Sequence, residues 1–389
     1  MRVLVLEGIV RECLAVVRSL GRRGITIDVA DSNRINPTRF SKYVSKFYIY
    51  PDPKDKREDF LKWLIRHIKI HSYDMIFPLN DYTYEICTRY QNEIRQHTSV
   101  AVNDWETFEL ARDKAKTIKY AQKIGIPVPL TWFPKSKEDL FKLEKEIPTY
   151  PVIIKPTKSS GSRGFKKLNN KKELFTSYEI LSKKFGSMLV QEYIPGREIL
   201  DVSVLFNMKS ELRAALVSNR IRMFPVEGGP NVAGHAVINE PLRQQAIKLM
   251  KSLKWKGVAL VEFKVDPRDN VPKLMEINPR FWGSTQLGIS AGIDWPWLLF
   301  NAVVKGDCET KMNYRTDRLV RWLLPGELLH FLTCKNKKDL WPDFFHFFNS
   351  NTEYYIFSKD DVMPVLGLLL TMLIKIFDPK MIRYFLTRR

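Results

Sequence analysis

The sequence has few cysteines and no cysteine-based site. Its 389 residues include four cysteines, Cys13, Cys87, Cys308 and Cys334, and none of them forms a C-x-x-C pair. This spacing argues against a zinc knuckle and a disulfide scaffold, so we expect reduced thiols in the core. The first apolar run is too short for a secretory signal, because Arg11 and Glu12 soon interrupt it. These features predict a cytoplasmic protein.

Two common nucleotide-binding fingerprints are also missing. Gly8 stands alone after the first predicted strand, without the G-x-G-x-x-G of dinucleotide-binding domains. The Walker pattern G-x-x-x-x-G-K-[ST] is absent as well. The sequence therefore argues against NAD and against a Walker-type phosphate loop.

Acidic residues are outnumbered by basic ones. The chain has 63 Lys and Arg against 43 Asp and Glu, a net charge of +20. Such a charge attracts nucleic acid, anionic lipid, or phosphorylated and carboxylated substrates. The basic residues are dispersed and form no basic arm or RNA-binding signature. We therefore expect small anionic substrates and no nucleic acid.

The length favours more than one domain, because a single core rarely exceeds roughly 250–300 residues. Residues 2–6 read as a buried strand, 12–20 as a helix and 25–30 as a second strand. This β-α-β unit predicts a parallel sheet. A helix over 60–70 and a strand over 75–79 complete a small open α/β domain.

The most informative polar residues lie on two strand-like segments around residue 270. Residues 257–263 and 273–280 alternate apolar and polar side chains and flank a turn-rich stretch, so they predict an antiparallel hairpin. If the hairpin pairs about Asp269, Glu262 faces Glu276 with Cβ atoms about 5 Å apart. Asn278 follows Glu276 by two residues and points to the same side of the sheet.

These oxygen atoms predict a metal site. Two carboxylates held so close repel each other and need a counter-cation. Oxygen ligands suit a hard ion, and Mg²⁺ that binds substrate phosphates needs few protein ligands. Arg280 is next on that face and could neutralise a transferring phosphoryl group. Taken alone, the pattern is more often an ordinary surface hairpin with solvent-facing acids.

Upstream segments supply candidate phosphate ligands. A helical segment begins at Asp104, a plausible N-cap, and passes through Lys114. The apolar strand over 151–156 carries Lys155, and a Ser/Gly-rich loop over 157–165 follows it directly. Small residues let backbone N–H groups approach phosphate oxygens, which the lysines could hold as point charges. On its own the loop is also typical of a flexible connection.

A further strand runs into a turn over residues 188–198. The backbone edge of such a strand can recognise an adenine ring. An acid that follows it can accept hydrogen bonds from ribose hydroxyls.

Taken in order, these segments resemble the ATP-grasp superfamily. The matching motifs are D-K before a helix ending in G-I-P-V-P, the V-I-I-K-P strand, the S-S-G-S-R-G loop, the Q-E-Y-I-P-G segment, and the V-E-F and M-E-I-N-P-R strands. They span roughly residues 100–300. The segments N-R-I-R-M-F-P and N-P-R-F-W-G-S are further similar to the carbamoyl-phosphate-synthase-like carboxylate–amine ligase branch.

The resemblance implies an α/β fold with an α+β ATP-grasp core. We expect an open parallel-sheet pre-ATP-grasp domain over residues 1–104 and the lid and small lobe over 105–190. A large lobe with the metal site is expected over 191–320, and a C-terminal helical extension over 321–389.

The resemblance also implies a role for each matching residue. Glu262, Glu276 and Asn278 would coordinate one or two Mg²⁺ ions, with Mn²⁺ as an alternative, and Arg280 would lie beside the γ-phosphate. The residues implied to contact ATP are Lys114, Lys155, Ser160, Gly161, Ser162, Gln191, Glu192, Tyr193, Ile194 and Glu198.

One part of the ribose segment departs from the family pattern. Family members often have an aromatic residue directly after G-x-E, whereas Ile199 follows Glu198 here. Either Glu198 or Asp201 could therefore face the ribose.

The implied reaction joins a small-molecule carboxylate to an amine. ATP would first phosphorylate the carboxylate, and the amine would displace phosphate to give an amide or peptide-like bond. Arg220 and Arg222 are candidates for holding a substrate carboxylate, since arginine pairs with it bidentately, although an exposed basic strand explains them equally well. His235 either contacts substrate or caps a loop.

Two other functions stay open at this point. The same metal site serves an ATP-dependent small-molecule kinase that releases its phosphorylated product. A non-catalytic ATP-binding regulator is the third reading, which a complete set of metal ligands disfavours.

The C-terminal region carries an apolar segment. Residues 362–377 number 16, fewer than the ~20 needed to cross a bilayer, so we expect a helix docked on the ligase body. Neighbouring aromatic residues such as Trp341 and the terminal Arg388 and Arg389 also allow peripheral contact with a membrane. A homo-oligomer is left open, and the sequence does not identify the substrates.

Overall fold

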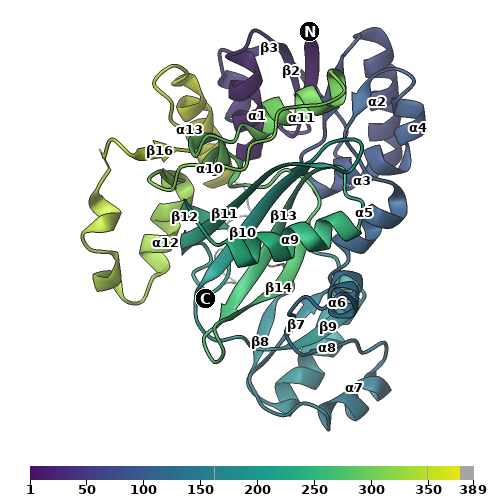
Figure 1. Ribbon diagram of the computed structural model, residues 1–389, viewed down its shortest axis with the longest axis vertical. Coiled ribbons are helices and arrows are strands. Elements are labelled where there is room, and N and C mark those ends of the chain that lie inside the picture. Colours follow the sequence, from purple (N-terminus) through teal and green to yellow (C-terminus); the bar gives the residue numbers. More distant parts are fainter. Residues whose placement is uncertain (162, 348, 377–389) are drawn as a thin grey trace.

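Three β-sheets organise the chain. The computed structural model describes residues 1–161, 163–347 and 349–376, and a sheet of five, four or seven strands lies at the centre of each of three parts (Figure 1). The parts are an N-terminal domain, a small lobe and a large lobe. This arrangement confirms the α/β fold with an α+β core.

The N-terminal domain is an open parallel sheet covered on both faces. Its elements are β1 (Arg2–Leu6), α1 (Arg11–Gly21), β2 (Thr26–Asp31), η1 (Thr38–Phe40), β3 (Val44–Ile49), α2 (Arg57–Ile70), β4 (Met75–Phe77), α3 (Asp81–Arg89), α4 (Gln91–Ile94) and β5 (Ser99–Val100). Val3 and Val5 of β1 pack with α1, whereas Leu4 and Leu6 pack with α2, so the strand is apolar on both sides. All five secondary-structure elements predicted for this region are present.

The strand order of this sheet creates a crevice. The order is β3-β2-β1-β4-β5, so successive connections leave β1 in opposite directions. Open α/β sheets bind ligands at such a reversal, outside the carboxyl ends of the strands. Here the Glu7 carboxylate accepts hydrogen bonds from the backbone N of Leu79 (2.8 Å) and Asn80 (3.1 Å), which ties the loops after β1 and β4 together.

Two helices lead into the small lobe. Asp104 caps α5 (Trp105–Arg112) as predicted, and Asp113 caps α6 (Lys114–Lys123) by accepting from two backbone N–H groups. The elements that follow are β6 (Thr131–Trp132), α7 (Lys137–Glu144), β7 (Val152–Pro156), β8 (Lys166–Leu168), α8 (Lys171–Phe185) and β9 (Met188–Glu192). Their sheet is antiparallel with order β6-β9-β7-β8.

The large lobe has a sheet of order β14-β13-β10-β11-β12-β15-β16. Its elements are β10 (Ile199–Phe206), β11 (Leu212–Met223), β12 (Asn231–Val237), α9 (Glu240–Ser252), β13 (Gly257–Asp266), β14 (Val271–Asn278), α10 (Thr285–Ser290), α11 (Trp295–Val304), β15 (Leu319–Arg321) and β16 (Thr352–Tyr354). The last two strands extend the sheet past residue 320, a feature that the sequence did not predict. The C-terminal extension therefore contributes strands as well as helices.

The remaining elements follow β15. They are η2 (Leu323–Glu327), α12 (Leu328–Thr333), η3 (Lys337–Leu340), η4 (Asp343–Phe345) and α13 (Met363–Ile376). Among the described residues, no helix is both long and apolar enough to cross a membrane.

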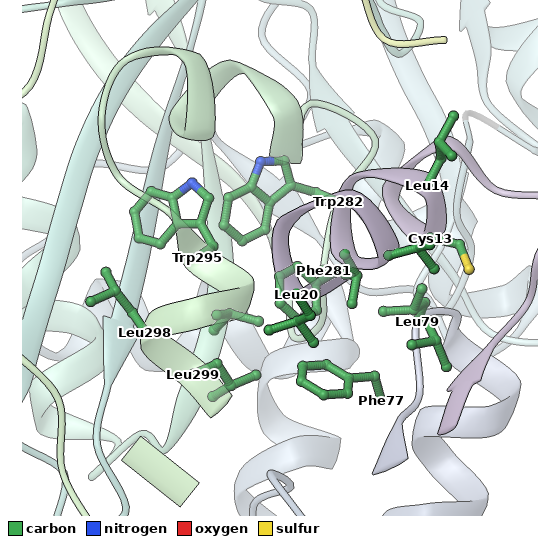
Figure 2. Close-up of a cluster of buried hydrophobic side chains, with 14 of the residues drawn as sticks. Cys13, Leu14, Leu20, Phe77, Leu79, Phe281, Trp282, Trp295, Leu298 and Leu299 are labelled. Atoms are coloured by element: carbon green, nitrogen blue, oxygen red, sulfur yellow. The ribbon is translucent and has the colours of Figure 1, made fainter. Parts of the chain in front are cut away.

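One hydrophobic core joins the N-terminal domain to the large lobe. Figure 2 shows side chains of α1 and β4 packed against the loop after β14 and against α11. The labelled residues are Cys13, Leu14, Leu20, Phe77, Leu79, Phe281, Trp282, Trp295, Leu298 and Leu299. Because this core is continuous, the two parts pack as one unit.

The C-terminal helix docks on the N-terminal domain. Gly367 of α13 approaches η1 so closely that a Cβ there would lie 2.6 Å from the Phe40 ring. Just before α13, Asp361 accepts hydrogen bonds from Arg18 Nε (2.9 Å) and Ser41 Oγ (2.7 Å). The structure thus confirms that the apolar segment forms a docked helix over its described residues, which exclude Phe377.

We predict that the ion pair between Asp361 and Arg18 stabilises the protein far more than the neighbouring ion pair between Asp360 and Arg22. Asp361→Asn leaves the Arg18 guanidinium buried without an ionised partner, so the free energy of unfolding falls by about 3–5 kcal/mol. Asp360→Asn breaks an ion pair with Arg22 whose side chains are 38–40% exposed, and costs about 1 kcal/mol or less. Urea denaturation of both variants measures the difference, and equal losses would contradict it.

Candidate active site

A cavity of about 680 Å³ lies where the N-terminal domain, both lobes and the C-terminal segment meet. Most of the predicted site residues line it, namely Lys114, Lys155, Ser160, Gly161, Glu192, Tyr193, Ile194, Arg220, Glu262, Glu276, Asn278 and Arg280. The structure does not bring Gln191, Glu198 or Arg222 into the lining, and Ser162 lies outside the described residues.

The hairpin of β13 and β14 pairs in the predicted register at the site. Glu262 lies opposite Glu276, and Leu260 lies opposite Asn278. Toward the turn the register shifts by one residue, which makes Met275 the extra residue of a β-bulge. Neighbouring residues of a regular strand point to opposite faces, but this bulge lets Met275 and Glu276 line the same cavity.

Each of the opposed carboxylates has its own cation. Lys114 Nζ lies 3.0 Å from Glu276 Oε2, and Asn278 Nδ2 donates to Glu276 Oε1 at 3.2 Å. Burial opposes ionisation of Glu276, but Lys114 and Lys155 outweigh it and lower its pKa. Burial raises the pKa of Glu262 to about 6, although Arg220 contacts it. Glu276 is therefore the firmly ionised member of the pair.

Lys155 is buried, and the neighbouring carboxylates offset its positive charge only in part. It lies on β7, and its side chain reaches the same cavity as Lys114. Burial and the neighbouring Lys114 lower its pKa to about 8, despite attraction to Glu276 and Glu262. An anion bound beside these ammonium groups would be strongly favoured.

The loop over residues 157–165 is held by hydrogen bonds from Lys114. Lys114 Nζ donates to the Ser159 carbonyl at 2.7 Å, and its backbone N donates to the Thr157 carbonyl at 2.9 Å. Gly164 has φ of 77°, and a Cβ there would lie 2.7 Å from Pro156, so this turn requires glycine. A phosphate group and this loop would thus share one ammonium group.

The predicted adenine edge lies partly in the cavity. Tyr193 and Ile194 line it, whereas Gln191 is fully buried and donates to Thr131 Oγ1 at 2.8 Å. The Glu192 carboxylate accepts from the backbone N of Leu130 at 2.9 Å. Apolar side chains also line the cavity, among them Ile153, Phe165, Ile194 and Met275.

Neither candidate ribose acceptor is a free carboxylate in the cavity. Glu198 is exposed and lies outside the lining. Asp201 lines the cavity, but both of its oxygens accept from Arg220, at 2.6 and 2.8 Å.

Arg280 is oriented by an acid that the sequence did not single out. Its Nε donates to Asp81 Oδ1 at 2.7 Å, and Asp81 begins α3 at the crevice of the N-terminal sheet. Burial opposes ionisation of Asp81, but Arg280 outweighs it and lowers the Asp81 pKa to about 2. This ion pair orients the guanidinium of Arg280, which lines the same cavity as Asn278.

The two predicted substrate arginines are already paired with carboxylates. Arg220 contacts Asp201 and Glu262, while Arg222 Nε lies 2.5 Å from Glu327 Oε1. Arg222 is buried and does not line the cavity. The interpretation of these residues as an exposed basic strand is wrong.

His235 does not cap a loop. It lies inside β12, opposite Asn219 of β11 and Leu319 of β15. It is absent from the residues that line the cavity.

The cavity also contains residues that sequence reasoning missed. Residues 9–12 follow β1, and Asn231 begins β12, while Ile356, Leu368 and Met372 come from the C-terminal segment. The position of residues 9–12 after the first strand of a β-α-β unit is a signal that could have found them. Nothing local marks the C-terminal residues, because their place depends on tertiary packing.

The carboxylate pair fits a magnesium ion that arrives with phosphate. Among the described residues, no group of three or more His, Cys, Asp or Glu side chains forms a metal cage. Glu262, Glu276 and Asn278 nevertheless supply oxygen atoms to the cavity that Lys114 and Lys155 also line, and Lys114 contacts Glu276 directly. Mg²⁺ commonly uses one or two carboxylates together with substrate phosphates, so this donor set suits it.

Comparison with known proteins agrees with this geometry. Residues 111–284 match the family model of the ATP-grasp domain, and these residues hold Lys114, Lys155, the hairpin and Arg280. The chain contains an ATP-grasp domain. Its boundaries enclose both the small lobe and the β13–β14 hairpin of the large lobe.

Relatives of the ATP-grasp domain include amino-acid ligases. A D-alanine–D-alanine ligase of Thermoanaerobacter sp. (strain X514) is 28% identical over 214 residues, which cover 48% of this chain and 58% of the relative. A D-aspartate ligase of Enterococcus faecium (strain Aus0004) is 23% identical and covers 64% of each chain. The chain thus spans about six tenths of the length of these relatives.

A solved structure shares the fold over more of the chain. The complex of Campylobacter jejuni biotin carboxylase with β,γ-ATP superposes with a TM-score of 0.68 at 18% identity, covering 82% of this chain and 74% of that one. The likeness therefore extends beyond the ATP-grasp domain into the N-terminal sheet.

We predict that Glu276→Gln weakens Mg-ATP binding roughly tenfold or more, because the firmly ionised metal ligand is lost. Asp269→Asn is the matched control, since it removes an acid from the turn of the same hairpin, outside the cavity. Isothermal titration calorimetry with and without Mg²⁺ measures both. An equal loss without the metal would contradict metal ligation by Glu276.

Proposed function

We propose that the protein is an ATP-dependent carboxylate–amine ligase that forms an amide or peptide-like bond. The observation that carries this proposal is the ionised Glu276, with Glu262 and Asn278, facing Lys114 and the under-compensated Lys155. The same part of the cavity thus offers oxygen ligands to a metal and ammonium groups to phosphate. The relatives named as D-alanine–D-alanine and D-aspartate ligases support the same class of reaction.

The chemistry requires activation of the carboxylate. An amine cannot displace oxide from a carboxylate, but it can displace phosphate from an acyl phosphate. ATP would supply the phosphoryl group and leave as ADP, and the amine would then attack the carbonyl carbon and release phosphate. The protein need not act as a nucleophile, because positioning and charge stabilisation account for catalysis of phosphoryl transfer.

Each charged residue has a place in this reaction. Lys114 and Lys155 would hold phosphate oxygens, and Arg280, oriented by Asp81, would lie beside the transferred group. Glu262, Glu276 and Asn278 would hold Mg²⁺, or Mn²⁺ in its place. The metal, when bound, supplies charge neutralisation across the phosphate oxygens.

The loop over residues 157–165 would exclude water. Ser160 and Gly161 line the cavity, and the adjoining Ser159 carbonyl is bonded to Lys114. When Lys114 contacts phosphate, the loop exchanges this hydrogen bond for backbone contacts to the nucleotide. Closure of the loop would protect an acyl phosphate from hydrolysis.

Isotope transfer tests the proposed reaction. With a carboxylate substrate labelled with ¹⁸O, a ligase transfers one labelled oxygen to the released phosphate, because that oxygen is lost from the acyl phosphate. ADP release should require both the carboxylate and the amine for full rate, with Glu276→Gln as the inactive control. Mass spectrometry of the phosphate gives the result.

The same experiment separates a kinase from a ligase. A kinase releases a stable phosphorylated product, no amide, and phosphate only by later hydrolysis. Absence of ADP release with every carboxylate and amine pair would instead favour a non-catalytic ATP-binding protein.

Peripheral membrane contact is a further proposal, carried by the outer face of α13. Leu366, Leu369 and Leu373 recur at helical spacing and are 43–52% exposed. We predict that Leu366→Glu with Leu369→Glu lowers co-sedimentation with anionic phosphatidylglycerol vesicles several-fold. Ile180→Glu, at an exposed apolar position of α8, is the control. Equal sedimentation of all three proteins would contradict contact through α13.

A cytoplasmic location stays a prediction of the sequence, and the oligomeric state stays open. The predicted domain boundaries at residues 104, 190 and 320 likewise stay predictions.

A further inference from the structure

Four side chains at one end of the cavity have buried polar atoms without hydrogen-bond partners among the described residues. The atoms are Arg11 Nη1, Asn231 Nδ2 and Oδ1, Trp322 Nε1 and Tyr355 Oη. Buried polar atoms normally have a hydrogen-bond partner, so several unpartnered atoms in one place need an explanation. Three of these residues, Arg11, Asn231 and Trp322, line the cavity.

Arg11 joins the four residues into one cluster. Its Nη2 donates to the Asn231 carbonyl at 2.7 Å. Its guanidinium carbon lies 4.4 Å from the centre of the Trp322 ring and 4.6 Å from that of Tyr355. Two aromatic rings and a backbone carbonyl thus hold the guanidinium in place. Gly283 permits the approach, since a Cβ there would lie 2.5 Å from Arg11 Nη2.

The cluster has positive charge and excess donors. Among the described residues, no ion pair joins Arg11 to a carboxylate, whereas Arg220 and Arg222 both have one. Burial lowers the pKa of Arg11, Tyr355 and Glu12 oppose this effect, and Arg220 adds to it. The unpartnered atoms of Arg11, Trp322 and Tyr355 are all donors, and Asn231 adds another. Such a set matches an anion with several acceptor oxygens.

The residues around the cluster are mostly apolar, although Glu12 and Thr371 also line the cavity, the latter with its hydroxyl bonded to the Gly367 carbonyl. Val10 and Pro37 come from the N-terminal domain, while Ile356, Leu368 and Met372 come from the C-terminal segment. None of these side chains can bond a polar substituent. The occupant of this end therefore needs an anionic group at Arg11 and an apolar body against the other residues.

We propose that Arg11, with Asn231 and Trp322, binds the carboxylate of a substrate that carries an apolar substituent, which packs on Ile356, Leu368 and Met372. The role of this group as a ligase substrate rests on the proposed function. Binding at Arg11 does not, because it requires neither ATP nor turnover. The site names the substrate class as an apolar carboxylate or an apolar amino acid.

The test measures binding of simple probes in the absence of ATP. Sodium acetate, butyrate and hexanoate are titrated by thermal shift and calorimetry, with hexylammonium chloride and sodium sulfate as controls. Hexanoate should bind most tightly, with roughly tenfold gained for each two CH₂ groups. Hexylammonium should not bind. Sulfate measures the anion binding that Lys114 and Lys155 supply. Hexanoate binding no tighter than acetate binding, or no carboxylate binding at all, would overturn the proposal.

Variants assign the probe to the cluster. Arg11→Met should weaken hexanoate binding at least about tenfold, since it removes a charge-assisted hydrogen bond. Arg11→Lys should restore part of it. Met372→Gln should reduce the advantage of hexanoate over acetate and leave acetate binding unchanged. Hexanoate binding that is equal in all of these proteins would place the ligand elsewhere and overturn the assignment.

The unliganded melting temperatures distinguish a binding role from a structural one. An arginine needed for folding loses stability when it becomes methionine, whereas removal of a buried, unneutralised charge should leave the melting temperature of Arg11→Met unchanged or higher. A large decrease in both Arg11→Met and Arg11→Lys, with unchanged hexanoate affinity, would contradict the proposal. Hexanoate binding that Arg11→Met abolishes, together with no ADP release for any carboxylate and amine pair, would refute the ligase and leave this site standing.

Discussion

The repulsion between Glu262 and Glu276 is the constraint on which the site depends. The hairpin register holds the two carboxylates directly opposite each other, so each must be compensated from outside the hairpin. Lys114 at the start of α6 serves Glu276, and Arg220 on β11 serves Glu262. Helix α6, strand β11 and the β13–β14 hairpin therefore meet at the cavity, where the cations of the first two offset the paired negative charges of the hairpin.

This compensation links ligand binding to the position of a loop. Lys114 Nζ contacts both Glu276 and the Ser159 carbonyl, so one ammonium group is bound both to the carboxylate pair and to the loop over residues 157–165. An ammonium group has three donors, and a bound phosphate would redirect at least one of them. Binding of a metal nucleotide would supply Glu276 with a new partner at the same time. Nucleotide binding would then break the hydrogen bond between Lys114 and the Ser159 carbonyl, so the loop would be released as the nucleotide binds.

Features set by local spacing could be predicted from the sequence, and features set by distant pairing could not. The hairpin register follows from an alternation of period two over residues 257–280, and the structure shows it with one bulge at Met275. Arg222 was misread because its partner Glu327 is 105 residues away, and Asp81 was missed because Arg280 is 199 residues away. Strands β15 and β16, of three residues each, are too short to leave an alternating pattern.

The arginines show why spacing alone does not assign a binding role. Arg220 and Arg222 alternate on a strand and looked available, but Asp201, Glu262 and Glu327 neutralise them. Arg11 had no motif around it, yet it lines the cavity without an ion pair among the described residues, as the exposed Arg163 also does, and its Nη1 is buried without a hydrogen-bond partner there. A guanidinium already matched with carboxylates gains little from another anion, whereas an unmatched one gains a partner that offsets its desolvation. The charge state of the neighbourhood, which only the fold determines, therefore decides which arginine can hold a substrate.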